Sequence, residues 1–331
     1  MTEKISSKRS YLGLLGAKTT HEVEARIVHQ IAAALAESGK NTIPLRLSTV
    51  ARGFSILPVP QFVSIDHDGE IAFDEKIARF VIRLRRPEQP TSMRSLGSNP
   101  RYRFTYAHEM AHRFFFVEHG GTWKRALDVA TAGLDLASRL REKITLSRIE
   151  EGMCNSVARR ILIPDSFLST HCPLDEWFSE GSKFFSLLTS AARSCCVSRD
   201  VLLLRLEKSR SFDGGFAMII GFSTGPVIHR GRRLLRVLSG LLPSGEESNG
   251  LAIYPGIPVQ DLGLEMVQFA AEAVRSADSV TREFRLPLRK SNGNLSAIAG
   301  WWRSLGKDER FIMWGRLEAA QSASTLPLNL D

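Results

Sequence analysis

The chain has 331 residues, which exceeds the usual size of one domain and predicts two or three compact units. Hydrophobic residues make up 43% and charged residues 24%, as in an ordinary globular protein, and no apolar run is long enough to span a membrane. The basic start has too short an apolar run for a signal peptide, so we expect a cytoplasmic location. The net charge of +9 is scattered along the chain and is weak evidence for a nucleic-acid partner.

The four cysteines, Cys154, Cys172, Cys195 and Cys196, form no C-x-x-C pair. Adjacent cysteines such as the last two rarely bridge each other. The pattern therefore indicates reduced thiols, and it supports neither a thiolate zinc site nor a disulfide framework.

The first predicted elements are a helix and a small sheet. Residues 20–38 predict a helix that stops at Gly39, and its apolar stripe consists of Val23, Ile27, Ile31, Ala34 and Leu35. Two short runs, 62–66 and 70–74, flank the turn His67-Asp68-Gly69 and predict a β-hairpin. Residues 78–86 alternate apolar with basic side chains and predict a further strand. This strand either lies at a sheet edge, where it could pair with an extended substrate, or has one buried and one solvated face.

Helical patterns follow a loop over 87–100. Residues 101–121 predict a helix that ends at Gly120-Gly121, and 123–146 look helical and charged. Residues 147–163 predict a new helix, because Ser147 and Glu150 have the spacing of a capping box and Pro164 closes the segment.

The last part of the chain predicts two further regions. Residues 183–208 have the outline of a helix-turn-helix, which allows DNA contact, but the second helix is rich in leucine and offers only Arg199 and Arg205 to phosphate, so plain helical packing is the alternative. After residue 212, strand-like runs and one helix near 261–276 predict a separate α+β unit. Its Trp301, Trp302 and Trp314 either line a ligand pocket or simply bury area.

The residues that carry chemistry lie in "YAHEMAHRFFF", where His108, Glu109 and His112 form an H-E-x-x-H motif. On a helix, residues four apart share one face, so both imidazoles can reach one zinc ion while Glu109 serves as the base for a water molecule. The metzincin pattern would need glycine and histidine where this chain has Phe115 and Glu118, so that class is excluded.

A catalytic zinc site needs a third protein ligand. In "EGMCN", Glu151 and Asn155 are four residues apart on a predicted helix. Glu151 could complete the ligand set while Asn155 orients His108 through a hydrogen bond. Glu150 is the alternative ligand, and it competes with its capping role.

In these two segments, "RYRFTYAHEMAH" and "EGMCNSVARRILIP", the sequence resembles the ImmA/IrrE-type metallopeptidase family, over about residues 20 to 170. The resemblance implies a gluzincin-like α+β peptidase fold with one zinc ion on His108, His112 and Glu151, and Glu109 as base. It also implies a protein substrate, of the transcriptional repressor or antitoxin type, and a role in regulatory proteolysis, as in stress response or defence. Cys154 replaces the usual alanine, and Met110-Ala111 the commoner Leu-Gly.

The expected architecture has three parts: a peptidase domain over 1–170, a helix-turn-helix-like segment over 171–211 and a sensor-like α+β domain over 212–331. Family members that carry such parts after the peptidase are similar in order and size. The expected function is a zinc-dependent, site-specific endopeptidase. The alternatives are a DNA- or protein-binding regulator with a non-catalytic peptidase-like domain, and a zinc amidohydrolase of small substrates.

Hydrolysis also needs a donor for the oxyanion. The sequence offers Tyr102, Tyr106, Arg113 and His119 near the motif without choosing among them, and we regard Tyr106 and His119 as the leading candidates.

Overall fold

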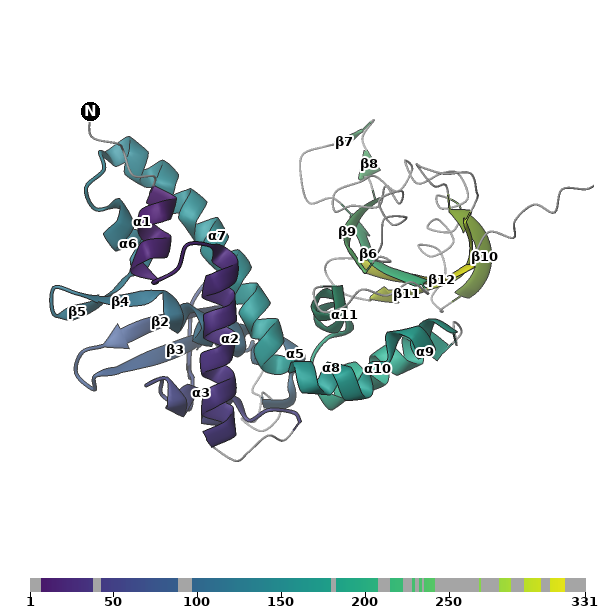
Figure 1. Cartoon of the computed structure of the whole chain (residues 1–331), viewed down its shortest axis with the longest axis horizontal. Helices are drawn as coiled ribbons and strands as arrows, with labels where there is room; N and C mark the ends of the chain where they lie inside the picture. The colour runs from purple at the N-terminus through teal and green to yellow at the C-terminus, as the bar shows by residue number, and fades with distance from the viewer. Residues whose placement is uncertain are drawn as a thin grey trace, which may run out of the picture. The chain divides into compact units, whose positions relative to one another are not determined.

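The computed structural model describes residues 7–37, 43–88, 97–179 and 183–207, and after these only Gln268 and the strands of the C-terminal part (Figure 1). The chain divides into two compact units. The first unit is Met1–Asp165 with Ala192–Ser198, and the second is Ser166–Ala191 with Arg199–Asp331. The described residues form a mixed α+β structure. The predicted domain boundaries at 170 and 211 stay predictions.

The first unit contains, in chain order, α1 (Ser7–Leu14), α2 (Thr20–Glu37), α3 (Leu47–Gly53), β1 (Gln61–Val63), β2 (Gly69–Asp74), β3 (Arg79–Arg85), α5 (Pro100–His112), a 3-10 turn (Arg113–Phe115), β4 (Phe116–His119), β5 (Thr122–Arg125), α6 (Ala126–Thr131) and α7 (Leu136–Leu162).

Helix α2 confirms the first predicted helix. Val23, Ile27, Ile31 and Leu35 are buried, and Ala34 is half-buried beside them. The helix packs along α7, as Figure 1 shows. Burial of this apolar stripe is what holds α2 in place. Gly39, the predicted stop, lies outside the described residues.

The small sheet corrects the predicted hairpin. Its strand order is β1-β3-β2, with β1 parallel to β3 and β2 antiparallel to β3. The hairpin is therefore formed by β2 and β3, and the segment over 62–66 is not its partner. Strand β3 is central, so the interpretation of residues 78–86 as an edge strand is wrong. The other interpretation, one buried and one solvated face, is confirmed except at Val81. Phe80, Ile82 and Leu84 are buried on one face, whereas on the other face Arg79 and Arg85 are exposed and Arg83 is half-buried.

Helix α5 is shorter than predicted. Asn99 caps its start by accepting from the backbone N–H groups of Arg101 and Tyr102, and Pro100 occupies the first turn. The helix ends at His112, and the following segment forms the hairpin β4–β5. Gly120 and Gly121 have φ of 63° and 79°, so they make the hairpin turn instead of ending a helix.

Helix α7 begins eleven residues before the predicted start. Asp135 is its N-cap and accepts from the backbone N–H of Ser138. Ser147 lies inside the helix, so the predicted capping box with Glu150 is wrong. The helix ends at Leu162, just before Pro164, as predicted. The helical prediction for 123–146 is also corrected, because β5, α6 and a break precede α7.

The second unit contains, in chain order, α8 (Asp165–His171), α9 (Leu174–Ser179), α10 (Phe184–Ser194), α11 (Arg199–Glu207), β6 (Gly215–Phe222), β7 (Ile228–His229), β8 (Arg232–Arg233), β9 (Leu235–Leu241), β10 (Val280–Leu286), β11 (Leu295–Ser304) and β12 (Arg310–Glu318). The first residue of α8 and the last three residues of α10 are assigned to the first unit. Five of its strands form an antiparallel sheet in the order β10-β11-β12-β6-β9. The helix predicted near 261–276 falls outside the described residues.

The predicted helix pair over 183–208 is present as α10 and α11. Leu202, Leu203 and Leu206 are buried, and α11 packs against β9 and β6. Arg205 is buried, and Arg199 donates to the Thr189 hydroxyl at 2.8 Å. Both arginines are thus engaged within the protein, which favours plain helical packing over phosphate contact.

Trp314 behaves as a core residue. Its ring is 3% exposed and stacks on Phe184 and Phe185, with centroid distances of 5.8 and 5.5 Å. The side chains of Trp301 and Trp302 are outside the described set. None of the described helices is long and apolar enough to cross a membrane.

Candidate metal centre

Helix α5 places the two histidines of the motif on one face. His108 and His112 are one helical turn apart, and their Nε2 atoms are 3.1 Å from each other. His112 is 7% exposed, and His108 is half-buried at the wall of a cavity. The i, i+4 spacing thus brings two imidazole nitrogens together, as the sequence predicts.

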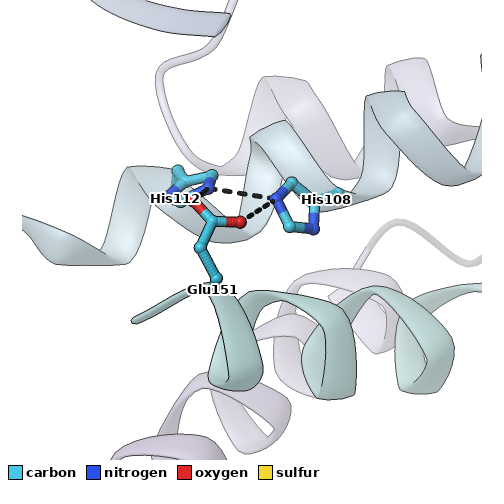
Figure 2. A group of neighbouring side chains, drawn as sticks. All are labelled: His108, His112 and Glu151. Carbon is cyan, nitrogen blue, oxygen red and sulfur yellow. Dashed lines mark hydrogen bonds and ion pairs between the residues drawn. The ribbon is translucent and has the colours of Figure 1, made fainter. Parts of the chain in front are cut away.

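Helix α7 supplies the third group. Glu151 lies 3.0 Å from His108 Nε2 through Oε2 and 3.4 Å from His112 Nε2 through Oε1. Figure 2 shows the two imidazoles of one helix converging on the Glu151 carboxylate of another. One donor atom from each of the three residues can be chosen so that all lie within 4.8 Å of one another, a cluster that could hold a metal ion.

The spacing of these atoms fits a tetrahedral ion. Zinc with bond lengths of about 2.0–2.2 Å has donor atoms roughly 3.3 Å apart. The two Nε2 atoms are 3.1 Å apart, and the Glu151 carboxylate lies 3.0 Å from His108 Nε2 through Oε2 and 3.4 Å from His112 Nε2 through Oε1, which is close to this spacing for each pair of atoms. Two imidazole nitrogens and one carboxylate are also a donor set that zinc uses in hydrolases, with a fourth position left for water.

Each histidine is held through its other nitrogen. Asn155 Oδ1 lies 3.1 Å from His108 Nδ1, and Glu150 Oε1 lies 2.8 Å from His112 Nδ1. An oxygen acceptor at Nδ1 fixes the proton there and leaves the Nε2 lone pair for a metal. Asn155 therefore occupies its predicted position, whereas Glu150 is directed at a histidine and not at the site of the ion.

Glu150 belongs to a buried network that the sequence did not reveal. Its side chain is fully buried, and besides His112 it accepts from Arg125 at 2.7 Å and from the Tyr11 hydroxyl at 3.1 Å. Burial and the neighbouring Glu150 raise the pKa of Tyr11, so this hydroxyl stays a donor. Tyr11 is 139 positions from Glu150 in sequence, and no local pattern connects them.

The pKa values of the two carboxyl groups beside the histidines, Glu151 and Glu109, are shifted in opposite directions. The adjacent imidazoles of His108 and His112 hold the pKa of Glu151 well below its usual range, so Glu151 is a carboxylate that can act as a metal ligand. Burial raises the pKa of Glu109, which is 7% exposed. A carboxylate with a raised pKa is a better proton acceptor, which suits the role predicted for Glu109.

The three residues open into a cavity of about 590 Å³. Glu109 and Asn155 line it as well, and so does the start of the edge strand β2. Gly69 in that strand lies so close to α5 that a Cβ there would be 2.9 Å from Thr105 Cγ2 and 3.1 Å from Glu109 Cγ. Glycine at this position allows the strand to approach helix α5.

The predicted oxyanion donors lie elsewhere. The Tyr106 hydroxyl donates to the Pro58 carbonyl at 3.0 Å, and His119 is exposed at the end of β4. Tyr102 lines a different cavity, and the Arg113 guanidinium lies over the ring of Phe80 at 4.1 Å. None of the four lines the cavity at the histidines.

His67 lines that cavity and was missed by the sequence analysis. A hydrogen bond from the ring to Asp66 at 2.8 Å raises the pKa of His67, which favours the protonated, donating form. The only sequence signal was its place in the turn before β2. Its position makes it a better candidate donor than Tyr106 or His119.

The cysteines add no ligand. Cys154, Cys172, Cys195 and Cys196 form no disulfide. Cys154 is the one near the histidines, and burial raises the pKa of its thiol to about 12. The cluster that could hold an ion consists of His108, His112 and Glu151 and does not include Cys154, so its donor atoms are nitrogen and oxygen.

A comparison with known proteins found no matching family model and no match among curated sequences.

Proposed function

We propose that the chain is a zinc-dependent endopeptidase with a gluzincin-like first unit, and that it cleaves a regulatory protein of the transcriptional repressor or antitoxin type at a defined bond. One observation carries the proposal: His108, His112 and Glu151 converge from two helices at 3.0 to 3.4 Å, beside the buried Glu109. The repressor or antitoxin target rests on the family resemblance alone.

The chemistry follows from the side chains around the cavity. A bound zinc ion supplies Lewis acidity, which lowers the pKa of a water and polarises a carbonyl. Glu109 accepts the proton of the attacking water and returns it to the leaving amine. Its burial supports this role, because a desolvated carboxylate binds a proton more tightly. Protonated His67 donates a hydrogen bond to the carbonyl oxygen as negative charge develops there.

A peptide substrate is supported by strand β2. Among the described residues this strand pairs only with β3, and its other edge remains available. The strand begins at Gly69 on the wall of the cavity. An extended peptide that adds to this edge would lie across the Glu109 carboxylate, with backbone hydrogen bonds providing affinity. We therefore propose strand addition at β2 instead of at residues 78–86.

The deciding variant is Glu109→Gln, which keeps the size and polarity of the side chain but removes the base. We expect cleavage to fall by about 10²-fold or more, with zinc content and circular dichroism unchanged. Cleavage is measured by labelling new protein N-termini in a proteome of the native host, incubated with either zinc-loaded protein. Glu118→Gln is the matched control, because Glu118 is exposed on β4 and outside the cavity.

The outcomes separate the functional classes. Termini that form with wild type and Glu118→Gln but not with Glu109→Gln support the endopeptidase. Identical termini with all three proteins, together with retained biological output of Glu109→Gln in cells, favour a binding regulator with a non-catalytic domain. Hydrolysis of a small amide, without any new protein terminus, favours an amidohydrolase.

A further inference from the structure

A second cavity, of about 320 Å³, lies in the first unit and uses different residues of helix α5. Tyr102, Arg103 and Tyr106 line it, whereas the metal centre uses His108 and His112. The rest of its wall is mainly apolar and includes Leu47, Pro58, Val59, Pro60, Phe62 and Leu84. The volume is that of a pocket for a small organic molecule.

The unusual member of this wall is Arg103, which is 7% exposed. Its guanidinium donates to the backbone carbonyls of Leu45 at 3.1 Å and Gly97 at 3.4 Å. A guanidinium has five N–H groups, so these two bonds leave capacity for more. The Nε atom is buried and has no hydrogen-bond acceptor among the described residues.

No acidic side chain of the described chain forms an ion pair with Arg103. Burial lowers the pKa of Arg103, while the nearby thiols of Cys196 and Cys195 act in the opposite direction. A buried cation is normally paired with an anion, and the described chain provides no carboxylate for this one.

We propose that this cavity binds a small carboxylic acid with an apolar, aromatic body, whose carboxylate pairs with Arg103. A planar guanidinium accepts a carboxylate through two parallel hydrogen bonds. The aromatic body is held against Phe62 and Tyr102, whose rings are 5.9 Å apart in an edge arrangement. Arg46 also lines the cavity, is exposed, and adds positive charge where the ligand enters.

The proposal is tested with 4-phenylbutyrate and its neutral counterpart 4-phenylbutanol, titrated into the full chain in a calorimeter. The two probes share the apolar body and differ in the charged group. We expect the acid to bind and the alcohol to bind about tenfold more weakly or worse, because a hydrogen bond to a charged group contributes more than a neutral one. Neither metal nor peptide cleavage enters the measurement, so its result is independent of the proposed function.

Two variants locate the binding. Arg103→Met removes the charge and should abolish the preference for the acid. Arg103 also donates hydrogen bonds to two backbone segments, so its replacement could disturb the fold, and Val59→Trp provides a second test. Val59 is 58% exposed on the cavity wall, and a larger side chain there should block entry of the ligand while the fold stays intact. Ile77→Trp is the matched control, because Ile77 is 46% exposed and outside the cavity. Equal binding of acid and alcohol, no binding of the acid at its solubility limit, or unchanged binding by Val59→Trp would overturn the proposal.

Discussion

Glu150 and Glu151 are neighbours on helix α7, yet they face different partners. Glu151 approaches the Nε2 atoms of both histidines, while Glu150 is bonded to His112 Nδ1 at 2.8 Å. A fully buried carboxyl group needs hydrogen-bond donors, which Arg125 and the Tyr11 hydroxyl supply. We infer that Glu150 is a positioning residue that directs the Nε2 lone pair of His112 toward the ion.

Glu150→Gln tests this role, because glutamine keeps the shape but loses the charge. Zinc affinity should fall by about 10- to 100-fold, the usual effect of removing a partner of a ligating histidine. Competition with a zinc chelator of known affinity measures the change. Tyr11→Phe removes one neutral donor from the same carboxylate and should have a smaller effect. If Glu150→Gln binds zinc as tightly as wild type, the charge of Glu150 does not contribute to positioning His112.

For single residues, the sequence predicts the positions that depend on spacing within one helix. His108, Glu109, His112, Glu151 and Asn155 all stand where the two motifs suggest. Tyr11 and Arg125 were missed because they reach Glu150 from distant segments, through contacts that no periodicity records. Tyr106 was favoured for its proximity in sequence, but the helix turns its hydroxyl toward Pro58.

Helix α7 carries a glycine beside its metal-site residue. Gly152 is exposed in the middle of the helix, and a Cβ there would meet nothing within 4 Å. Glycine costs a helix interior roughly 0.5–1 kcal/mol relative to alanine. Gly152→Ala should therefore raise the free energy of unfolding by about that amount, as measured by denaturant titration, and leave zinc affinity unchanged. A loss of stability would mean that this part of α7 needs the freedom of glycine.

The approach of β2 to α5 is sensitive to one methyl group. In Gly69→Ala the added Cβ would press on Thr105, Leu84 and Glu109, at 2.9 to 3.1 Å. Overpacking of this kind costs about 1–3 kcal/mol. Because Glu109 is among the atoms that must move, we expect the cleavage rate to fall more than zinc affinity does.

Gly133→Ala is the control for this substitution, since a Cβ at Gly133 would meet no atom within 4 Å. The rate of cleavage of the substrate found with wild type, and zinc affinity, are measured for both variants. Equal loss of rate in the two would show that the packing of β2 on the helix has no special part in catalysis.

The predicted bounds of a helix agree with the structure where the sequence carries a single clear pattern. They differ where two patterns in the same segment predict different structures. The apolar stripe of α2 predicted that helix well. Ser147 and Glu150 resembled a cap, but no glycine or proline lies between Leu136 and Glu151, so α7 continues through them. The partner of β1 could not be predicted, because pairing with β3 is a long-range contact that alternation along one strand does not specify.

In the whole molecule, the candidate metal ligands and the C-terminal sheet belong to different compact units. His108, His112 and Glu151 belong to the first unit, and so do the groups that hold them, Glu150 and Asn155. The strands β6 and β12 belong to the second unit. A ligand that binds only the folded state stabilises whatever unfolds together with its site. The segments that zinc stabilises are therefore the segments that unfold together with its binding site.

The rate of amide hydrogen exchange, measured for each peptide with and without zinc, identifies these segments. At a free zinc concentration of 100 times its Kd, stabilisation is about 2.7 kcal/mol, so exchange that requires unfolding of the site should slow by roughly 10²-fold. We expect this slowing in peptides of α5 and α7, and no change in β6 and β12. Glu151→Ala, which lacks one ligand, should remove the effect throughout. Equal slowing in β12 would mean that the two units unfold as one, and that zinc occupancy is felt by the C-terminal sheet.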